Sequence, residues 1–144
     1  MGFAIATNGT LLSEEKVKRL EELDCQYIQI SLDGKKETHN EMRGSNMYEK
    51  TIKGIKNAVN SDITVGVAMT VTKDNIDEVD SLIELTEESG ADIFMHYNFI
   101  PTGRGKEMTI LDISPEEREY LMRKLVYESK NRDIKVLSTA PQYG

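Results

Sequence analysis

The sequence predicts an α/β fold, a partial (β/α) barrel fragment of about five parallel strands and four helices. Short β-prone runs alternate with segments of helical period along all 144 residues, and such alternation implies right-handed crossovers and a parallel sheet. Several of the expected strands also carry one apolar face and one small or polar face. Both faces of a doubly wound sheet are covered and apolar, so a curled sheet with a wet interior explains this pattern better.

The first half of the chain is expected to hold three strands and two helices. Ser13 is a suitable N-cap for the first helix, because Glu14 and Glu15 follow it near the positive end of the helix dipole. Asn46 and Glu49 have the spacing of a capping box at the start of the second helix. The expected strands are residues 3–7, 26–32 and 63–72, and residues 34–45 are expected to form a polar connecting segment.

The second half of the chain repeats this alternation. Asn75 and Glu78 have capping-box spacing for a third helix, which Gly90 is suited to end. Ser114 and Pro115 suit the start of a fourth helix, as an N-cap followed by proline at the first helical position. The remaining expected strands are residues 92–100 and 134–138.

The composition indicates a cytoplasmic protein and argues against several classes of partner. A formal net charge of −7 disfavours nucleic acid or an anionic membrane as the main partner, because an acidic domain repels both. No segment approaches the ~20 apolar residues of a membrane span. Cys25 is the only cysteine, so we expect a reducing compartment, a structural thiol and no metal site within the chain.

The polar face of the expected strands points to a ligand site at one end of the sheet. Alternate residues share a face of a strand, which groups Gln29 with Ser31 and His96 with Asn98. On the third expected strand the corresponding residues, Thr70 among them, are all small or hydroxylic. Ligands of parallel α/β sheets bind at the carboxyl ends of the strands, so we expect the site there.

Three short motifs together resemble the radical S-adenosylmethionine (radical SAM) enzymes. One expected strand ends in Thr7-Asn8-Gly9, another ends in Ser31-Leu32-Asp33-Gly34, and HNEMRG follows at 39–44. The set is similar to the branch that includes enzymes of coenzyme PQQ synthesis, haem and haem d1 maturation, and anaerobic sulfatase maturation. The segments PTGRG at 101–105 and APQYG at 140–144 look most like the haem-maturation members.

The resemblance implies places for S-adenosylmethionine and for a substrate. Ser31 and Arg43 match the family positions that hold the ribose or methionine part of this cofactor, and a guanidinium suits its carboxylate. Asn8, on the neighbouring strand end, is a further candidate for the same pocket. The substrate pocket is expected to include Asp33, Thr70, His96, Asn98 and Arg104, the last as a partner for an acidic group such as a tetrapyrrole carboxylate.

The resemblance also implies an iron–sulfur enzyme of cofactor or peptide maturation, in which a 4Fe–4S cluster reduces the sulfonium and releases a 5′-deoxyadenosyl radical. The family binds that cluster through a C-x3-C-x2-C motif, which this chain lacks. We therefore expect residues 1–144 to be a single domain of a longer enzyme, with no catalytic residue, bound cofactor or activity of its own. An unpaired strand edge at 3–7 would let the isolated chain self-associate.

The sequence leaves other interpretations open. The chain could be a cluster-free ligand-binding or scaffold domain, or an ordinary barrel enzyme with Asp33 and His96 as an acid–base pair. The motif that begins at Ser31 could be only a strand end and a turn, and Arg104 could lie in a simple turn. His39 is expected to be a loop or surface residue. The substrate could be a tetrapyrrole-like small molecule or a peptide.

Overall fold

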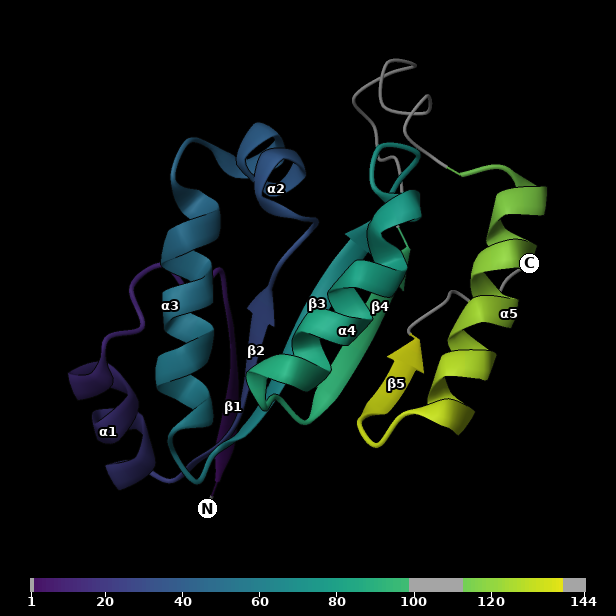
Figure 1. Ribbon diagram of the computed structural model, residues 1–144. Coiled ribbons are helices and arrows are strands. Elements are labelled where there is room, and N and C mark those ends of the chain that lie inside the picture. The colour runs from purple at the N-terminus through teal and green to yellow at the C-terminus, as the bar shows by residue number, and fades with distance from the viewer. Residues whose placement is uncertain (1, 99–112, 139–144) are drawn as a thin grey trace.

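The computed structural model describes residues 2–98 and 113–138, which form one parallel sheet with helices packed against it (Figure 1). The five strands lie in the order β1-β2-β3-β4-β5, so each is hydrogen-bonded to the next strand along the chain. A doubly wound sheet reverses its strand order, and the prediction of a partial (β/α) barrel is therefore confirmed. The strands are β1 Phe3–Thr7, β2 Cys25–Ser31, β3 Thr64–Val71, β4 Ile93–Asn98 and β5 Lys135–Ser138.

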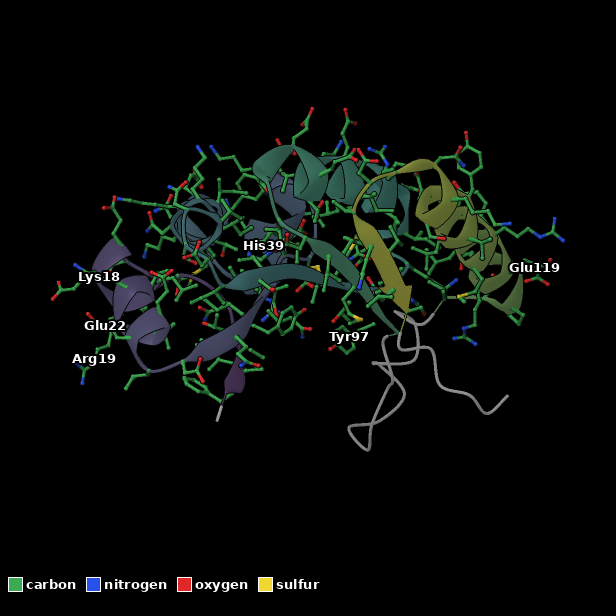
Figure 2. All side chains as sticks on the ribbon, turned by 90° about the horizontal axis from the view of Figure 1, so that it is seen from below. Lys18, Arg19, Glu22, His39, Tyr97 and Glu119 are labelled. Carbon is green, nitrogen blue, oxygen red and sulfur yellow. The ribbon has the colours of Figure 1, made fainter. Side chains whose placement is uncertain are left out.

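The helices cover one face of the sheet. Helices α1, α3, α4 and α5 lie along the outer side of the curved strands, and α2 lies beyond the carboxyl end of β2 (Figures 1 and 2). The inner side carries no helix within the described residues, so it forms an open face. The helices are α1 Glu14–Glu22, α2 Lys36–Arg43, α3 Met47–Val59, α4 Val79–Ser89 and α5 Pro115–Asn131, with a short 3-10 helix, η1, at Ile76–Glu78.

Helix α2 corrects the predicted number of four helices, because it occupies the segment that was expected to be a polar connection. His39 is its only buried residue, so the segment has no apolar stripe from which a helix could be predicted. Its N-terminus is stabilised from elsewhere in the chain. The Glu78 carboxylate accepts the Lys35 N–H at 2.6 Å and the Thr38 hydroxyl, near the positive end of the helix dipole.

The apolar core lies between the sheet and the helices. Side chains on the outer face of β2, β3 and β4 are fully buried, and each contributes ~1.5–3 kcal/mol to the free energy of unfolding. These strand residues are Ile28, Ile30, Val65, Val67, Met69 and Phe94, and the helices cover them with Ile55, Leu82, Ile83 and Leu121. The core therefore fixes the strands from one side and leaves the open face to other contacts.

The register shows which residues share the open face. Aligned residues of neighbouring parallel strands point to the same side of a sheet. Gln29 aligns with Gly66 and Gly66 with Ile93, while Thr70 aligns with Tyr97. Small and polar residues of β2 and β3 thus line the open face, as the sequence predicts.

The predicted face of His96 is wrong. The register aligns His96 with Met69 and Tyr97 with Thr70, so Tyr97 lies on the open face and His96 lies beneath the helices. His96 is completely buried, and its Nδ1 lies 2.8 Å from the Ser138 hydroxyl of β5. The prediction assigned the apolar residues of β4 to the helix side, but this strand also places apolar residues on the open face.

Candidate cofactor site at the ends of β2 and β3

Asp33 is the centre of a hydrogen-bonded cluster just beyond the carboxyl end of β2. Its side chain is 2% exposed, and its Oδ1 accepts the Thr70 N–H at 3.1 Å. Its Oδ2 accepts from Arg43 Nε at 2.8 Å and lies 2.6 Å from Arg43 Nη2. A buried carboxylate is costly unless it is paired and hydrogen-bonded, and these three contacts meet that requirement.

Arg43 is the last residue of helix α2, and its guanidinium contacts Asp33 while remaining partly exposed to solvent. Its side chain is 41% exposed, although two of its nitrogens contact the buried Asp33 carboxylate. Within residues 2–98 and 113–138, no side chain accepts from its Nη1. The geometry leaves donors directed away from Asp33 that could bind a second carboxylate.

Asn75 connects the loop after β2 to the end of β3. Its amide is completely buried and donates to the Asp33 carbonyl and to the Thr70 carbonyl, both at 2.8 Å. Its Oδ1 accepts the Thr72 N–H at 2.7 Å. The predicted capping box of Asn75 and Glu78 is wrong, because neither side chain caps η1 or α4.

His39 supports the same loop from helix α2. Its ring is 2% exposed, and Nδ1 accepts the Asp33 N–H at 3.1 Å, which places the proton of the neutral ring on Nε2. Burial lowers the pKa of His39, and the Arg43 charge lowers it further, while the Asp33 charge opposes both. The expectation that His39 is a surface residue is therefore wrong, since the ring is a buried acceptor.

The other predicted cofactor residues lie at the same end of the sheet. Ser31 is half-buried and closes β2 on the open face, and its hydroxyl makes no hydrogen bond within the described ranges. Asn8 follows β1, and its Oδ1 accepts from the Thr10 N–H at 3.0 Å and the Thr10 hydroxyl at 2.8 Å. Asn8 thus stabilises its own exposed turn, while the Ser31 hydroxyl has no partner among the residues that the structure describes.

The predicted substrate residues are not all brought together. Thr70 lies on the open face and Asp33 lies in the cluster, but His96 lies beneath the helices. Asp33 contacts Arg43 and Thr70 beyond the end of β2, whereas His96 contacts Ser138 of β5, so the two side chains have different partners and the structure does not support them as an acid–base pair. Asn98 is the last residue of β4, and its side chain is not described. Arg104 and the segments 101–105 and 140–144 also lie outside the described residues.

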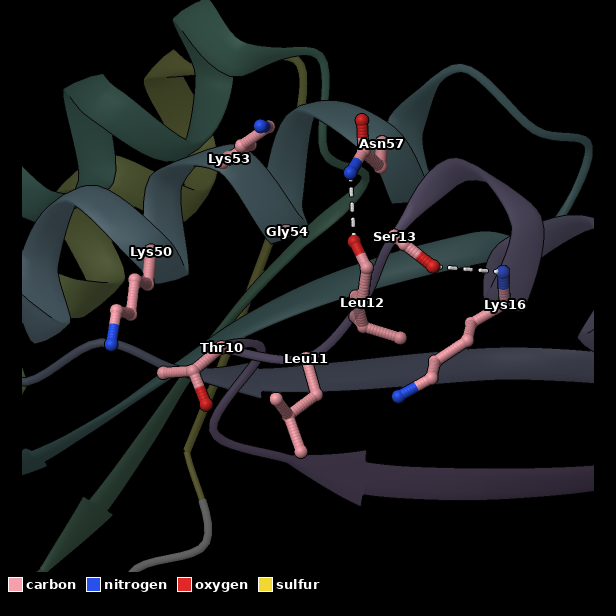
Figure 3. Close-up of a pocket in the computed structure, with 9 residues that line it drawn as sticks. All are labelled: Thr10, Leu11, Leu12, Ser13, Lys16, Lys50, Lys53, Gly54 and Asn57. Carbon is pink, nitrogen blue, oxygen red and sulfur yellow. Dashed lines mark hydrogen bonds between the residues drawn. The ribbon is translucent and has the colours of Figure 1, made fainter.

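A separate surface pocket of about 490 Å³ lies beside the loop that follows β1 (Figure 3). Lys16, Lys50 and Lys53 line it, and the Asn57 amide donates to the Leu12 carbonyl at its wall, at 2.7 Å. The pocket is formed by that loop, α1 and α3, and none of the predicted cofactor or substrate residues lines it.

The described residues do not fit an iron–sulfur cluster. Such clusters are bound mainly by cysteine thiolates, and Cys25 is the only cysteine of the chain. Its buried thiol donates to the Tyr27 carbonyl at 3.5 Å, at the amino end of β2 and away from Asp33. Across residues 2–98 and 113–138, no three histidine, cysteine or acidic side chains are grouped to hold a metal ion. No helix in these ranges is long and apolar enough to cross a membrane.

Comparisons with known proteins find relatives in sequence and a similar fold. Two relatives come from Methanosarcina barkeri. An Fe-coproporphyrin III synthase is 34% identical over 118 residues, which are 81% of this chain and 30% of the relative. An AdoMet-dependent heme synthase is 34% identical over 142 residues, which are 96% of this chain and 40% of the relative. The chain thus spans less than half the length of these relatives.

A maturation protein and a solved structure are also similar to this chain. The sporulation killing factor maturation protein SkfB of Bacillus subtilis is 35% identical over 115 residues, which are 78% of this chain and 28% of SkfB. The crystal structure of Streptococcus suis SuiB has a TM-score of 0.75 at 16% identity and covers 96% of this chain and 33% of SuiB. At that identity the likeness shows the fold alone.

The family assignment depends on a model that matches more than half of the chain. The matched residues, 1–86 of 144, run from β1 through η1 into α4 and include Asn8, Ser31, Asp33 and Arg43. The relatives at 34% identity cover most of the chain and point the same way. The chain therefore belongs to the radical SAM superfamily.

Proposed function

We propose that this chain is part of a longer radical SAM enzyme that matures a tetrapyrrole cofactor. Two relatives at 34% identity are named as an Fe-coproporphyrin III synthase and a heme synthase, and this chain spans only 30% and 40% of their lengths. The 4Fe–4S cluster would be bound by residues outside this chain, because Cys25 alone does not fit it. With one buried free thiol and an acidic composition, we place the protein in the cytoplasm.

The observation that carries the proposal is the guanidinium of Arg43, which buried Asp33 holds at the strand end where Ser31 is half-buried on the open face. S-adenosylmethionine, when bound and reduced, supplies a radical that removes a hydrogen atom from the substrate. Arg43 would donate to the carboxylate of the cofactor through the nitrogen that Asp33 does not use. Ser31 would donate to, or accept from, its ribose or amino acid part.

Binding of S-adenosylmethionine to the intact protein, measured by isothermal titration calorimetry, tests this role. Arg43→Gln should weaken binding by about tenfold to a hundredfold, because a charge-assisted hydrogen bond is lost. Ser31→Ala should weaken it by about three- to tenfold. Arg123→Gln is the matched control, since Arg123 lies on α5 with a side chain 78% exposed. Unchanged binding by Arg43→Gln would show that Arg43 does not contact the cofactor.

Peptide maturation is the second candidate function. SkfB is 35% identical to this chain, and a SuiB structure of the same fold, with TM-score 0.66, is bound to its precursor peptide SuiA. Titration of the intact protein with coproporphyrin III, followed by its visible absorption, separates the two functions. Saturable binding supports the tetrapyrrole function, and its absence favours a peptide substrate.

A cluster-free scaffold domain is the non-enzymatic alternative. Anaerobic reconstitution of the intact protein with iron and sulfide, followed by iron analysis and a search for 5′-deoxyadenosine, separates it from an enzyme. We expect the intact protein to hold iron and to form 5′-deoxyadenosine, and the isolated chain of 144 residues to do neither. An intact protein that takes up no iron would favour the scaffold.

A further inference from the structure

A line of three polar side chains crosses the open face of the sheet from β2 to β4. The Tyr27 hydroxyl donates to Gln29 Oε1 at 3.2 Å, and Gln29 Nε2 donates to the Tyr97 hydroxyl oxygen at 3.0 Å. All three side chains are half-buried, and Tyr97 lies on the inner side of the curved strands in Figure 2. The contact joins residues 68 positions apart in sequence, so it is a product of the fold.

Gly66 of β3 makes room for this line. A Cβ at Gly66 would lie 2.1 Å from the Tyr27 hydroxyl oxygen and 2.9 Å from its Cζ. Real atoms do not approach so closely, and any side chain at this position would displace the Tyr27 ring. The hydrogen bonds that cross above β3 therefore require glycine at position 66.

The hydrogen bonds lead from Tyr27 to Tyr97, whose own hydroxyl has only a weak acceptor within the described residues. Tyr27 donates to the Gln29 amide, and that amide donates to Tyr97. The only acceptor for the Tyr97 proton within the described residues is Gln29 Oε1, at 3.3 Å. This distance is long for an O–H···O bond, whose usual length is about 2.7–2.8 Å. The Tyr97 hydroxyl and the second N–H of Gln29 can therefore turn to a stronger acceptor on the open face.

The surroundings of Tyr97 on the open face are apolar with one cation. Ile93 and Met95 share its face of β4, and they align with Lys135 and Leu137 of β5. Leu137 is 42% exposed, and no helix within the described ranges covers this part of the sheet (Figure 2). A flat apolar body with oxygen acceptors at its edge would fit such a surface.

We propose that Tyr97, aligned by Gln29 and Tyr27, donates a hydrogen bond to a carboxylate of the tetrapyrrole substrate, whose ring lies against Ile93, Met95 and Leu137. This inference rests on the proposed function and adds a substrate-binding residue to it. Tyr97 contacts the substrate, whereas Gln29 and Tyr27 are positioning residues that hold the phenol in place. Tyr27 is the first donor of the line, and burial, with a further contribution from Tyr97, raises its pKa further above neutral pH.

The test is a titration of the intact protein with coproporphyrin III and with its tetramethyl ester, followed by visible absorption. Tyr97→Phe should weaken binding of the free acid by about tenfold, the loss expected for a hydrogen bond to a charged acceptor. It should weaken binding of the uncharged ester by less than about threefold. Tyr127→Phe is the matched control, because Tyr127 lies on α5 and is 64% exposed.

Two further variants test the positioning of Tyr97. Tyr27→Phe and Gly66→Ala should both weaken acid binding by about two- to fourfold, since each disturbs the alignment of Gln29 without removing the final donor. Circular dichroism of every variant checks that the fold is kept.

The outcomes separate this inference from the proposed function. A wild-type protein that binds no coproporphyrin III overturns the tetrapyrrole function and this inference with it. A wild-type protein that binds, together with a Tyr97→Phe variant that binds equally well, overturns the inference alone. An equal loss for the acid and the ester also overturns it, because Tyr97 would then only shape the surface.

Discussion

At the scale of single residues, Asp33 and Arg43 form the contact on which the proposed cofactor site depends. The carboxylate is almost fully buried and the guanidinium is partly exposed, so the pair links the interior of the protein to its surface. Because the carboxylate also accepts the Thr70 N–H, its position is fixed by β3 as well as by α2. Changes to either partner should therefore affect both stability and cofactor binding.

We expect Arg43→Gln to lower the free energy of unfolding by about 2–3 kcal/mol, because Asp33 would stay buried without a cation. Urea unfolding followed by circular dichroism measures this loss. Lys36→Gln is the control: Lys36 pairs with Glu49 at 3.0 Å with side chains 62% and 50% exposed, and should lose no more than about 1 kcal/mol. Equal losses in the two variants would show that burial of Asp33 adds nothing to the pair.

His39 should make stability depend on pH. Its pKa in the folded protein lies below the ordinary value of 6.5, so the unfolded chain takes up a proton first as the pH falls. Stability contributed by the neutral ring is complete above that value and is lost as the pH falls from 6.5 towards the folded pKa. His39→Asn keeps an acceptor near Nδ1 and does not titrate. Its melting temperature should therefore fall less than that of the wild type between pH 8 and pH 5.5, and parallel curves would contradict this role.

The sequence could predict that candidate site residues lie close together only where those residues are near one another along the chain. Ser31, Asp33 and Arg43 lie within one strand end and the segment that follows, so their motif places them together. The hydrogen bonds between Asn75 and Asp33 and between Lys35 and Glu78 join residues 42 and 43 positions apart. Local sequence patterns cannot predict contacts between residues so distant in sequence. Asn75 and Glu78 also have capping-box spacing, and the local pattern favoured that wrong interpretation.

At the scale of elements, two asparagines with the same predicted role differ in what they do. Asn46 precedes α3 with a left-handed φ of 65° and makes no side-chain bond to the helix. Asn75 makes three hydrogen bonds, one to the Asp33 carbonyl beyond β2 and two to Thr70 and Thr72 at the end of β3. Its amide therefore adds to the contact between the Thr70 N–H and Asp33 in joining the ends of these two strands.

Asn75→Ala should lower the free energy of unfolding by about 3 kcal/mol, since two buried partners and one partly buried partner would lose their bonds. Asn46→Gly should change it by less than about 0.5 kcal/mol, because glycine adopts the same positive φ without strain. Urea unfolding of both variants gives the comparison. A loss for Asn46→Gly as large as that for Asn75→Ala would mean that capping of α3, and not the strand connection, is what matters.

Elements were predictable where a strong local signal agrees with the tertiary fold. The capping box of Ser114 and Glu117 is present at the start of α5, and Gly90 ends α4 in the left-handed conformation. Helix α2 could not be predicted from local sequence, because its N-terminus is stabilised by the carboxylate of Glu78, which is distant in sequence. The faces of β4 were misassigned because both carry apolar residues, so hydropathy could not separate the buried side from the open side.

At the scale of the whole molecule, the sheet has two edge strands, β1 and β5, and one face that no helix of the described residues covers. The fold class was predictable because the alternation of strands and helices repeats along the entire chain, and a repeated signal survives local errors. Among the strands of residues 2–98 and 113–138, β1 pairs with β2 alone, and Phe3 on this edge is 39% exposed. Exposed backbone donors and acceptors on such an edge are free to pair with another chain.

We expect the isolated chain to self-associate through the β1 edge as its concentration rises. Phe3→Lys should reduce this association, because a charge on an edge strand disfavours pairing with a second strand. Leu11→Lys is the control, since Leu11 is 73% exposed but lies outside the strands. Light scattering after size-exclusion chromatography measures the mass. A monomer at every concentration, or an equal effect of both substitutions, would contradict the role of this edge.

The order of the strands bears on how the sheet is made during synthesis. Each of the strands β2 to β5 is hydrogen-bonded to the strand translated immediately before it. In a doubly wound sheet, some strands pair with a neighbour that is synthesised much later. None of these five strands depends on a later strand being inserted between it and the strand before it. Each new βα unit can dock as it emerges, with only its own connection to close. At each stage, the last strand formed has an unpaired edge, and the next strand pairs with that edge.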